Sequence, residues 1–115
     1  MAKDDYYVIV YQILAYLYRT LKDGEKVDPA MLMHDSPLLN INEPYWKYII
    51  ENMIRQGFIE GVGTTNAWGG EVFFTDFSQC RITPAGIDYL CENSTIKKAY
   101  RFLKDAKSLV PFDLL

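Results

Sequence analysis

The sequence is poor in the residues from which enzyme and metal sites are usually built. It holds one histidine, His34, and two cysteines, Cys80 and Cys91, in 115 residues. Two cysteines and one histidine cannot supply the four ligands of a zinc site, and neither a nucleophile-elbow nor a phosphate-loop motif occurs. We therefore expect no metal, no cofactor and no enzymatic activity. The cysteines have no second pair, which favours free thiols in a reducing cytosol over a disulfide.

Long apolar runs and an export signal are also lacking. No apolar run approaches the ~20 residues that span a bilayer. The N-terminus, MAKDDYY, places two acids before the first apolar run, which is not typical of a secretion signal. We expect a cytoplasmic protein with no membrane partner, folded as one domain over residues 1–115.

Positive charge is scarce outside one segment. The net charge is −3, but residues 95–108 hold five basic residues against Asp105, so they carry +4 and the remainder −7. No Lys or Arg lies between Glu60 and Cys80. Non-specific nucleic-acid binders usually run basic overall, so this distribution stands against strong non-specific DNA binding.

The best-defined element is the stretch over residues 41–62. Asn42 is expected to cap a helix over about 43–56, with Pro44 in its first turn and Gly57 as its left-handed end. The helix has one apolar stripe with i, i+3, i+4 spacing. The residues of this stripe are Trp46, Ile49, Ile50, Met53 and Ile54. We expect them to be buried, and a strand to follow at residue 58.

The remaining pattern predicts an α+β fold, a winged helix. Helices are expected over about 6–21, 29–34, 84–92 and 95–108, and a β-hairpin wing over about 58–82. Their starts are predicted at Asp4 or Asp5, at Asp28-Pro29, at Thr83-Pro84 and at Ser94 or Thr95. Helices 29–34 and 43–56 form a helix-turn-helix pattern, and the last two helices are additions to the fold.

Two features leave alternatives open. Tyr7, Tyr11 and Tyr18 form a second apolar stripe on the first helix, which either the rest of the domain or a second copy of the chain could cover. A homodimer with these tyrosines at the contact is our prediction. Trp68 lies in a glycine-rich loop tip, where it either folds back on the domain or is an exposed anchor for a partner.

Three segments resemble the YjcQ-like family of small winged-helix proteins of bacteria and prophages. They are YIIENMIRQGFIEGV, ITPAGIDYL and ENSTIKKAYRFLKDAK, and the likeness spans nearly the whole chain. The resemblance implies a DNA-binding-like domain without an established biochemical role. Winged helices also serve as protein-protein modules, so fold alone does not fix the function.

Two functions follow as hypotheses. In the first, double-stranded DNA is the partner of a prophage-associated transcriptional regulator, and helix 43–56 enters the major groove. Asn52 would read adenine and Arg55 guanine. Phosphate contacts would come from Lys47 and Tyr48 and from the basic last helix, through Lys97, Lys98 and Arg101. In the second, the chain is a non-enzymatic protein-protein interaction or assembly module.

Overall fold

The computed structural model of the protein describes residues 1–106. The fold is α+β, with four α-helices, one short 3-10 helix and two antiparallel two-stranded sheets in the described residues. In chain order the elements are α1 (Tyr6–Asp23), η1 (Pro29–Leu32), α2 (Glu43–Arg55), β1 (Ile59–Glu60), β2 (Gly63–Asn66), β3 (Val72–Asp76), β4 (Arg81–Ile82), α3 (Pro84–Glu92) and α4 (Ser94–Asp105).

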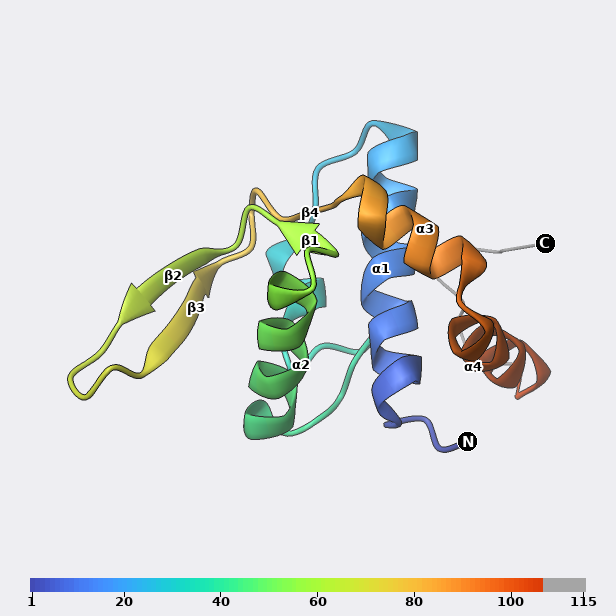
Figure 1. The fold of residues 1–115 in the computed structure, drawn as a ribbon, viewed down its shortest axis with the longest axis horizontal. Helices are drawn as coiled ribbons and strands as arrows, with labels where there is room; N and C mark the ends of the chain where they lie inside the picture. Colours follow the sequence, from blue (N-terminus) through green and yellow to red (C-terminus); the bar gives the residue numbers. More distant parts are fainter. Residues whose placement is uncertain (107–115) are drawn as a thin grey trace.

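Helix α1 is the centre of the fold. It stands between α2 on one side and α3 and α4 on the other, and the β2–β3 hairpin extends away from the helices on the side of α2 (Figure 1). The second apolar stripe of α1 is covered within the chain only in part. Tyr11 is fully buried, with its ring 5.8 Å from that of Tyr100 on α4, whereas Tyr7 is 39% exposed. The residues of α1 buried in the core are Val8, Ile9, Val10, Tyr11, Ile13, Leu14, Ala15 and Leu17.

Three predicted helix starts are confirmed by their cap hydrogen bonds. The side chain of Asn42 accepts from the backbone N–H of Tyr45 at 2.8 Å, and that of Thr83 accepts from Gly86 at 3.0 Å. The Asp28 carboxylate accepts from Ala30 at the start of η1. Side-chain oxygens at these positions satisfy N–H groups that have no partner inside the helix.

The two other helices begin where predicted, but their cap contacts differ from those of the first three. Asp5 lies at the N-cap of α1, but its carboxylate accepts from the N–H of Ala2, outside the helix. Helix α4 begins at Ser94, as one of the two predicted starts has it, but the capping side chain is Asn93, which accepts from Thr95 and Ile96.

Helix α2 ends as its glycine predicts. Gly57 has φ +76°, its N–H donates to the carbonyl of Ile54, and the next N–H, of Phe58, donates to that of Met53. This pair of hydrogen bonds is the Schellman motif, and the left-handed residue in it is usually glycine, which lacks a Cβ. The chain then turns directly into β1.

The predicted second helix is shorter than expected. Only a 3-10 turn, Pro29–Leu32, forms in place of the helix over 29–34. The next residues instead make a compact turn in which Leu39 and Asn40 both donate to the Ser36 carbonyl. The predicted wing over 58–82 is divided between the β1–β4 pair and the β2–β3 hairpin. The predicted end of the last helix, at residue 108, lies outside the described residues.

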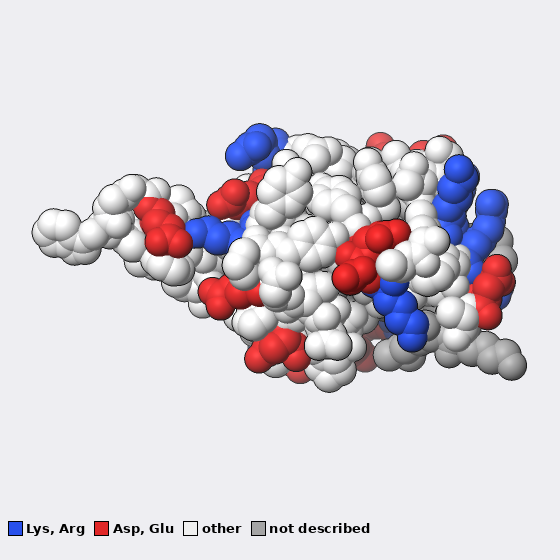
Figure 2. Space-filling view, turned by 90° about the horizontal axis from the view of Figure 1, so that it is seen from below, with Lys and Arg blue, Asp and Glu red and all other residues white. Residues whose placement is uncertain are grey.

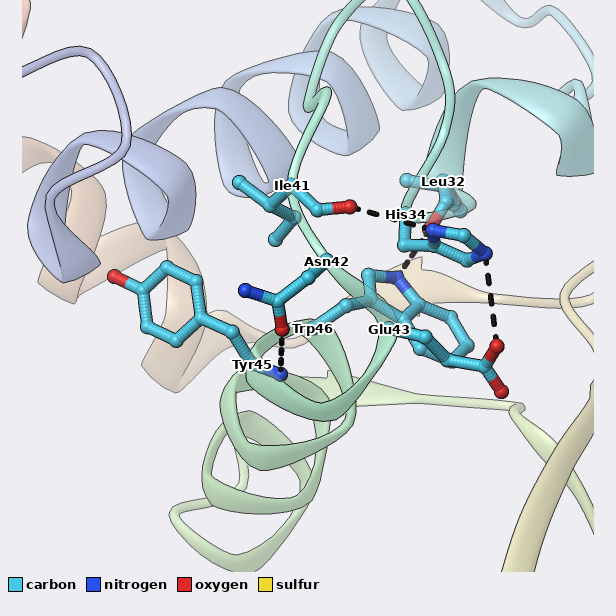
Figure 3. Close-up of polar contacts among 7 residues, drawn as sticks. All are labelled: Leu32, His34, Ile41, Asn42, Glu43, Tyr45 and Trp46. Atoms are coloured by element: carbon cyan, nitrogen blue, oxygen red, sulfur yellow. Dashed lines mark hydrogen bonds and ion pairs between the residues drawn. The ribbon is translucent and has the colours of Figure 1, made fainter.

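Trp46 fixes the start of α2 against η1. Its indole N–H donates to the carbonyl of Leu32 at 2.8 Å (Figure 3). Its ring contacts those of Phe74 and Phe77. His34 bridges the same region: Nδ1 lies 3.3 Å from the carbonyl oxygen of Ile41, and Nε2 lies 3.8 Å from a carboxylate oxygen of Glu43. These contacts set the orientation in which α2 presents its outer face.

The buried stripe of α2 is one residue narrower than predicted. Trp46, Ile49, Ile50 and Met53 are buried, whereas the side chain of Ile54 is 36% exposed. Successive residues are turned by about 100° around a helix, so Ile54 lies at the edge of the stripe, where the core ends.

We expect Ile50→Ala to lower the free energy of unfolding by ~2–5 kcal/mol, because it leaves a cavity among fully buried side chains. Urea denaturation measures the change. The matched control is Ile54→Ala, which removes the same atoms from the edge of the stripe and should cost well under half as much. Equal losses for the two variants would contradict the burial described above.

The two thiols lie in different environments. Cys80 is 2% exposed, and burial raises the pKa of its thiol from 9.0 to about 12, whereas Cys91 is exposed. Above pH ~9 the Cys80 thiol loses its proton in the unfolded state but keeps it in the folded state, so the unfolded state binds fewer protons. The free energy of unfolding should therefore fall as the pH rises from about 9 toward 12.

We expect one thiol to react with a thiol-specific reagent in the native protein at mildly alkaline pH and both to react in urea, because only the thiolate is nucleophilic. Counting the released chromophore measures this. Cys91→Ser should abolish the native reaction, while rapid labelling that persists in this variant would show that Cys80 is accessible.

Candidate interaction surface around α2

The four predicted DNA contacts of α2 differ in what they can reach. Lys47 is held by the hairpin: its Nζ lies 3.2 Å from Glu71 Oε1 and 5.2 Å from the centre of the Phe73 ring. The Asn52 amide donates to the carbonyl of Tyr48 in the same helix at 2.8 Å. Tyr48, 58% exposed, and Arg55 are therefore the two predicted contacts with the most accessible side chains.

The three predicted contacts of α4 lie elsewhere. Helix α4 packs on α1 and α3, across α1 from α2 (Figure 1). Lys98 and Arg101 are exposed and Lys97 is half-buried. Figure 2 shows the blue side chains of α4 at the end of the molecule opposite the hairpin. The structure therefore does not bring the seven residues together on one surface.

Four tyrosines from three helices meet beside the outer face of α2. We call Tyr6 and Tyr7 of α1, Tyr48 of α2 and Tyr89 of α3 the tyrosine surface. The Tyr6 ring lies 5.1 Å from that of Tyr7 and 6.2 Å from that of Tyr48, both edge to face. Tyr7 is 39% exposed, while Tyr6 and Tyr89 are half-buried. Rigid aromatic rings with a polar tip are thus gathered at one place.

The pKa values of these phenols reflect their crowding. Burial raises the pKa of Tyr6, and the neighbouring Tyr48 and Tyr7 raise it further, while a hydrogen bond with Gln56 lowers it. The pKa of Tyr89 is raised by burial and then by Tyr7 and Tyr6. Tyr6 and Tyr89 are therefore neutral at physiological pH, and each of these two phenols can both donate and accept a hydrogen bond.

Two contacts hold the rings in place. Tyr89 stacks on Phe58 with 4.3 Å between ring centres. Gly86 lies so close to the Phe58 carbonyl that any Cβ at this position would collide with it, so α3 can pack directly on the chain that follows α2. Sequence reasoning missed the tyrosine surface, because its members lie on three helices and no spacing along the chain relates them.

Acidic groups border the tyrosine surface on the side of the N-terminus. The Tyr45 hydroxyl donates to the Asp4 carbonyl oxygen at 2.8 Å. Burial raises the pKa of Tyr45, and the negative charges of Asp4 and Asp5 raise it further. The surroundings of the tyrosines are thus negative at these points.

The hairpin presents aromatic side chains and no positive charge. Trp68 at its tip is fully exposed, at 102% of the reference accessibility, and Phe73 is 42% exposed. The interpretation in which Trp68 folds back on the domain is therefore wrong. On the inner side Phe74 contacts Trp46, and the Lys47–Glu71 ion pair ties the hairpin to α2.

The predicted tyrosine stripe of the first helix is not one accessible surface. Tyr7 belongs to the tyrosine surface, Tyr18 is half-buried beneath the ammonium of Lys22, and Tyr11 is 0% exposed. Tyr11 cannot contact a second copy, because α4 covers it, so this part of the predicted contact is wrong. Tyr7 and Tyr18 lie about three turns apart along α1.

The described residues lack a cluster of metal-binding side chains. Within residues 1–106 no three His, Cys, Asp or Glu side chains come together as a metal site would require. A cavity of about 380 Å³ lies among Lys3, Gln12, Leu39 and Leu103, and the buried Gln12 Oε1 beside it has no hydrogen-bond partner there. No helix in this part of the chain is long and apolar enough to cross a bilayer.

Comparison with known proteins places the chain in a family. The family model described as YjcQ protein matches residues 11–109, which is most of the chain and includes every element from α2 to α4. No curated protein matches the chain significantly, and no solved structure does so. The protein belongs to the YjcQ family.

Proposed function

We propose that this protein is a winged-helix domain that acts as a non-enzymatic protein-interaction module in the cytoplasm. The turn of η1, the capped helix α2 and the antiparallel strands that follow have the order of a helix-turn-helix with a wing. In this interpretation α2 is the third helix of the motif and β2–β3 is the wing.

The tyrosine surface is the observation that carries the proposal. Its member Tyr48 lies on the outer side of α2, where a DNA-binding winged helix would need cations for the phosphates. Tyr, Trp and Arg dominate the energetics of protein interfaces, and Tyr48 and Arg55 are exposed on α2. Tyrosine offers a large contact area with few rotatable bonds to immobilise. Trp68 on the hairpin adds a second exposed anchor.

Sequence-specific DNA binding, as by a prophage-associated regulator, is the second candidate. The exposed side chains of Tyr48 and Arg55, two turns apart on α2, favour it. Three observations weigh against it: the ion pair of Lys47 with Glu71, the lack of Lys and Arg between Glu60 and Cys80, and the position of α4 across α1.

A photo-crosslinking amino acid at position 48 tests the main proposal. In an extract of the organism that encodes the chain, we expect position 48 to give a specific protein adduct. The matched control is position 21, where Leu21 is 50% exposed on the far end of α1. A nucleic-acid adduct at position 48, or the same adducts at both positions, would contradict a protein-binding role of this face.

A titration of labelled random and genomic duplexes at low salt separates the two candidates, because electrostatic attraction is least screened there. We expect no binding. If DNA does bind, Arg55→Ala should weaken binding to the preferred sequence by ~1–3 kcal/mol. The logarithm of the affinity should also fall with the logarithm of the salt concentration, with a slope of about 0.9 for each phosphate contact. Lys98→Ala should then leave the affinity unchanged, since α4 does not flank α2.

A further inference from the structure

Helix α4 concentrates the positive charge of the protein on one exposed face. Lys98, Arg101 and Lys104 are exposed and Lys97 is half-buried, and none of them makes an ion pair with a carboxylate of residues 1–106. The helix carries +3, whereas the other described residues hold seven basic and thirteen acidic side chains and so carry −6. The charge of the chain is thus divided between a basic helix and an acidic body.

We propose that the basic face of α4 in one copy docks on the tyrosine surface of a second copy. This inference rests on the proposed function, in which the tyrosine surface binds protein, and it names the partner. The exposed rings of Tyr7 and Tyr48 and the carboxylates of Asp4 and Asp5 on one copy would meet Lys98 and Arg101 of the other. The cations of α4 make no ion pair with the described carboxylates, and these two acids are opposite to them in charge.

Contacts inside the chain show the chemistry that the docking would use. The ammonium of Lys22 lies 5.3 Å from the centre of the Tyr18 ring, and that of Lys104 lies 5.6 Å from the centre of the Tyr100 ring. Cations within about 6 Å of an aromatic face are attracted by the negative ring surface. Arginine is the better partner, because its planar group also stacks on the ring.

A second copy fits α4 better than a nucleic acid does. Ile96, Ala99 and Leu103 form the apolar face of α4 and are already buried in the core. A partner of α4 therefore contacts its cations and not an apolar groove. The other described residues carry −6, which opposes the approach of a polyanionic duplex. A second copy presents carboxylates beside aromatic rings instead.

The basic face of α4 and the tyrosine surface are separate, so each copy can dock its α4 on a partner and also accept the α4 of a partner. Figure 2 shows the blue side chains of α4 at the end of the molecule away from the hairpin, with red and blue groups scattered over the face between them. Because donor and acceptor patches are distinct, the contact closes as a reciprocal dimer or continues as a chain of copies.

Sedimentation equilibrium of the full chain tests the proposal. We expect association that weakens as salt is raised, and a loss of about tenfold or more in affinity for Lys98→Glu/Arg101→Glu and for Asp4→Lys/Asp5→Lys, since like charges then face each other. Mixing these two variants should restore association between them. The control pair Lys22→Glu/Lys26→Glu makes the same charge change at the other end of α1 and should leave the affinity unchanged.

Tyr7→Ala/Tyr48→Ala should weaken association without changing the charge, and circular dichroism verifies that each variant is folded. A monomer at all concentrations at low salt overturns this inference, as does failure of the mixed variants to associate. The proposed function is judged separately, by the protein adduct at position 48. Binding of random duplexes that is lost in Lys98→Glu/Arg101→Glu would assign α4 to nucleic acid and also overturn the docking.

Discussion

The burial of most of both apolar stripes of α1 is the constraint on which the rest of the structure depends. A helix that is apolar around most of its circumference must be covered on several sides. In this protein α2 covers one side and α3, α4 and β4 cover the others. The covering of Tyr11 by Tyr100 brings α4 back to the centre of the fold. It also places the N-terminal turn of α1, with Tyr6 and Tyr7, between α2 and α3, where the tyrosine surface arises.

The orientation of α2 rests on a small set of polar contacts around an aromatic core. Trp46 buries its ring against Phe74 and Phe77, and its N–H satisfies the carbonyl of Leu32, which would otherwise be buried without a partner. These ring contacts pack the hairpin against α2, and the Lys47–Glu71 ion pair links the two at the surface. One consequence is chemical: the cation that could have met a phosphate is already paired.

Charge and aromaticity are separated on the surface in a way that suits protein partners. Positive side chains of α4 lie at the end of the molecule away from the hairpin (Figure 2). Asp4 and Asp5 lie near Tyr45, and the hairpin is without cations. Electrostatic complementarity of this kind sets specificity and the rate of encounter more than affinity. The aromatic rings supply the buried area on which affinity depends. The two together are the physical basis for proposing protein binding over DNA binding.

The sequence alone determined the elements whose signals are local. Asn42 and Gly57 set the two ends of α2, and Thr83 sets the start of α3, because cap hydrogen bonds and a left-handed turn involve residues only a few positions apart. Tertiary structure decided the burial of Tyr11, the exposure of Ile54 and Trp68, the pairing of Lys47 with Glu71 and the meeting of four tyrosines. These features depend on which helices and strands pack together, and contacts between segments far apart in the chain leave no periodic mark in the sequence.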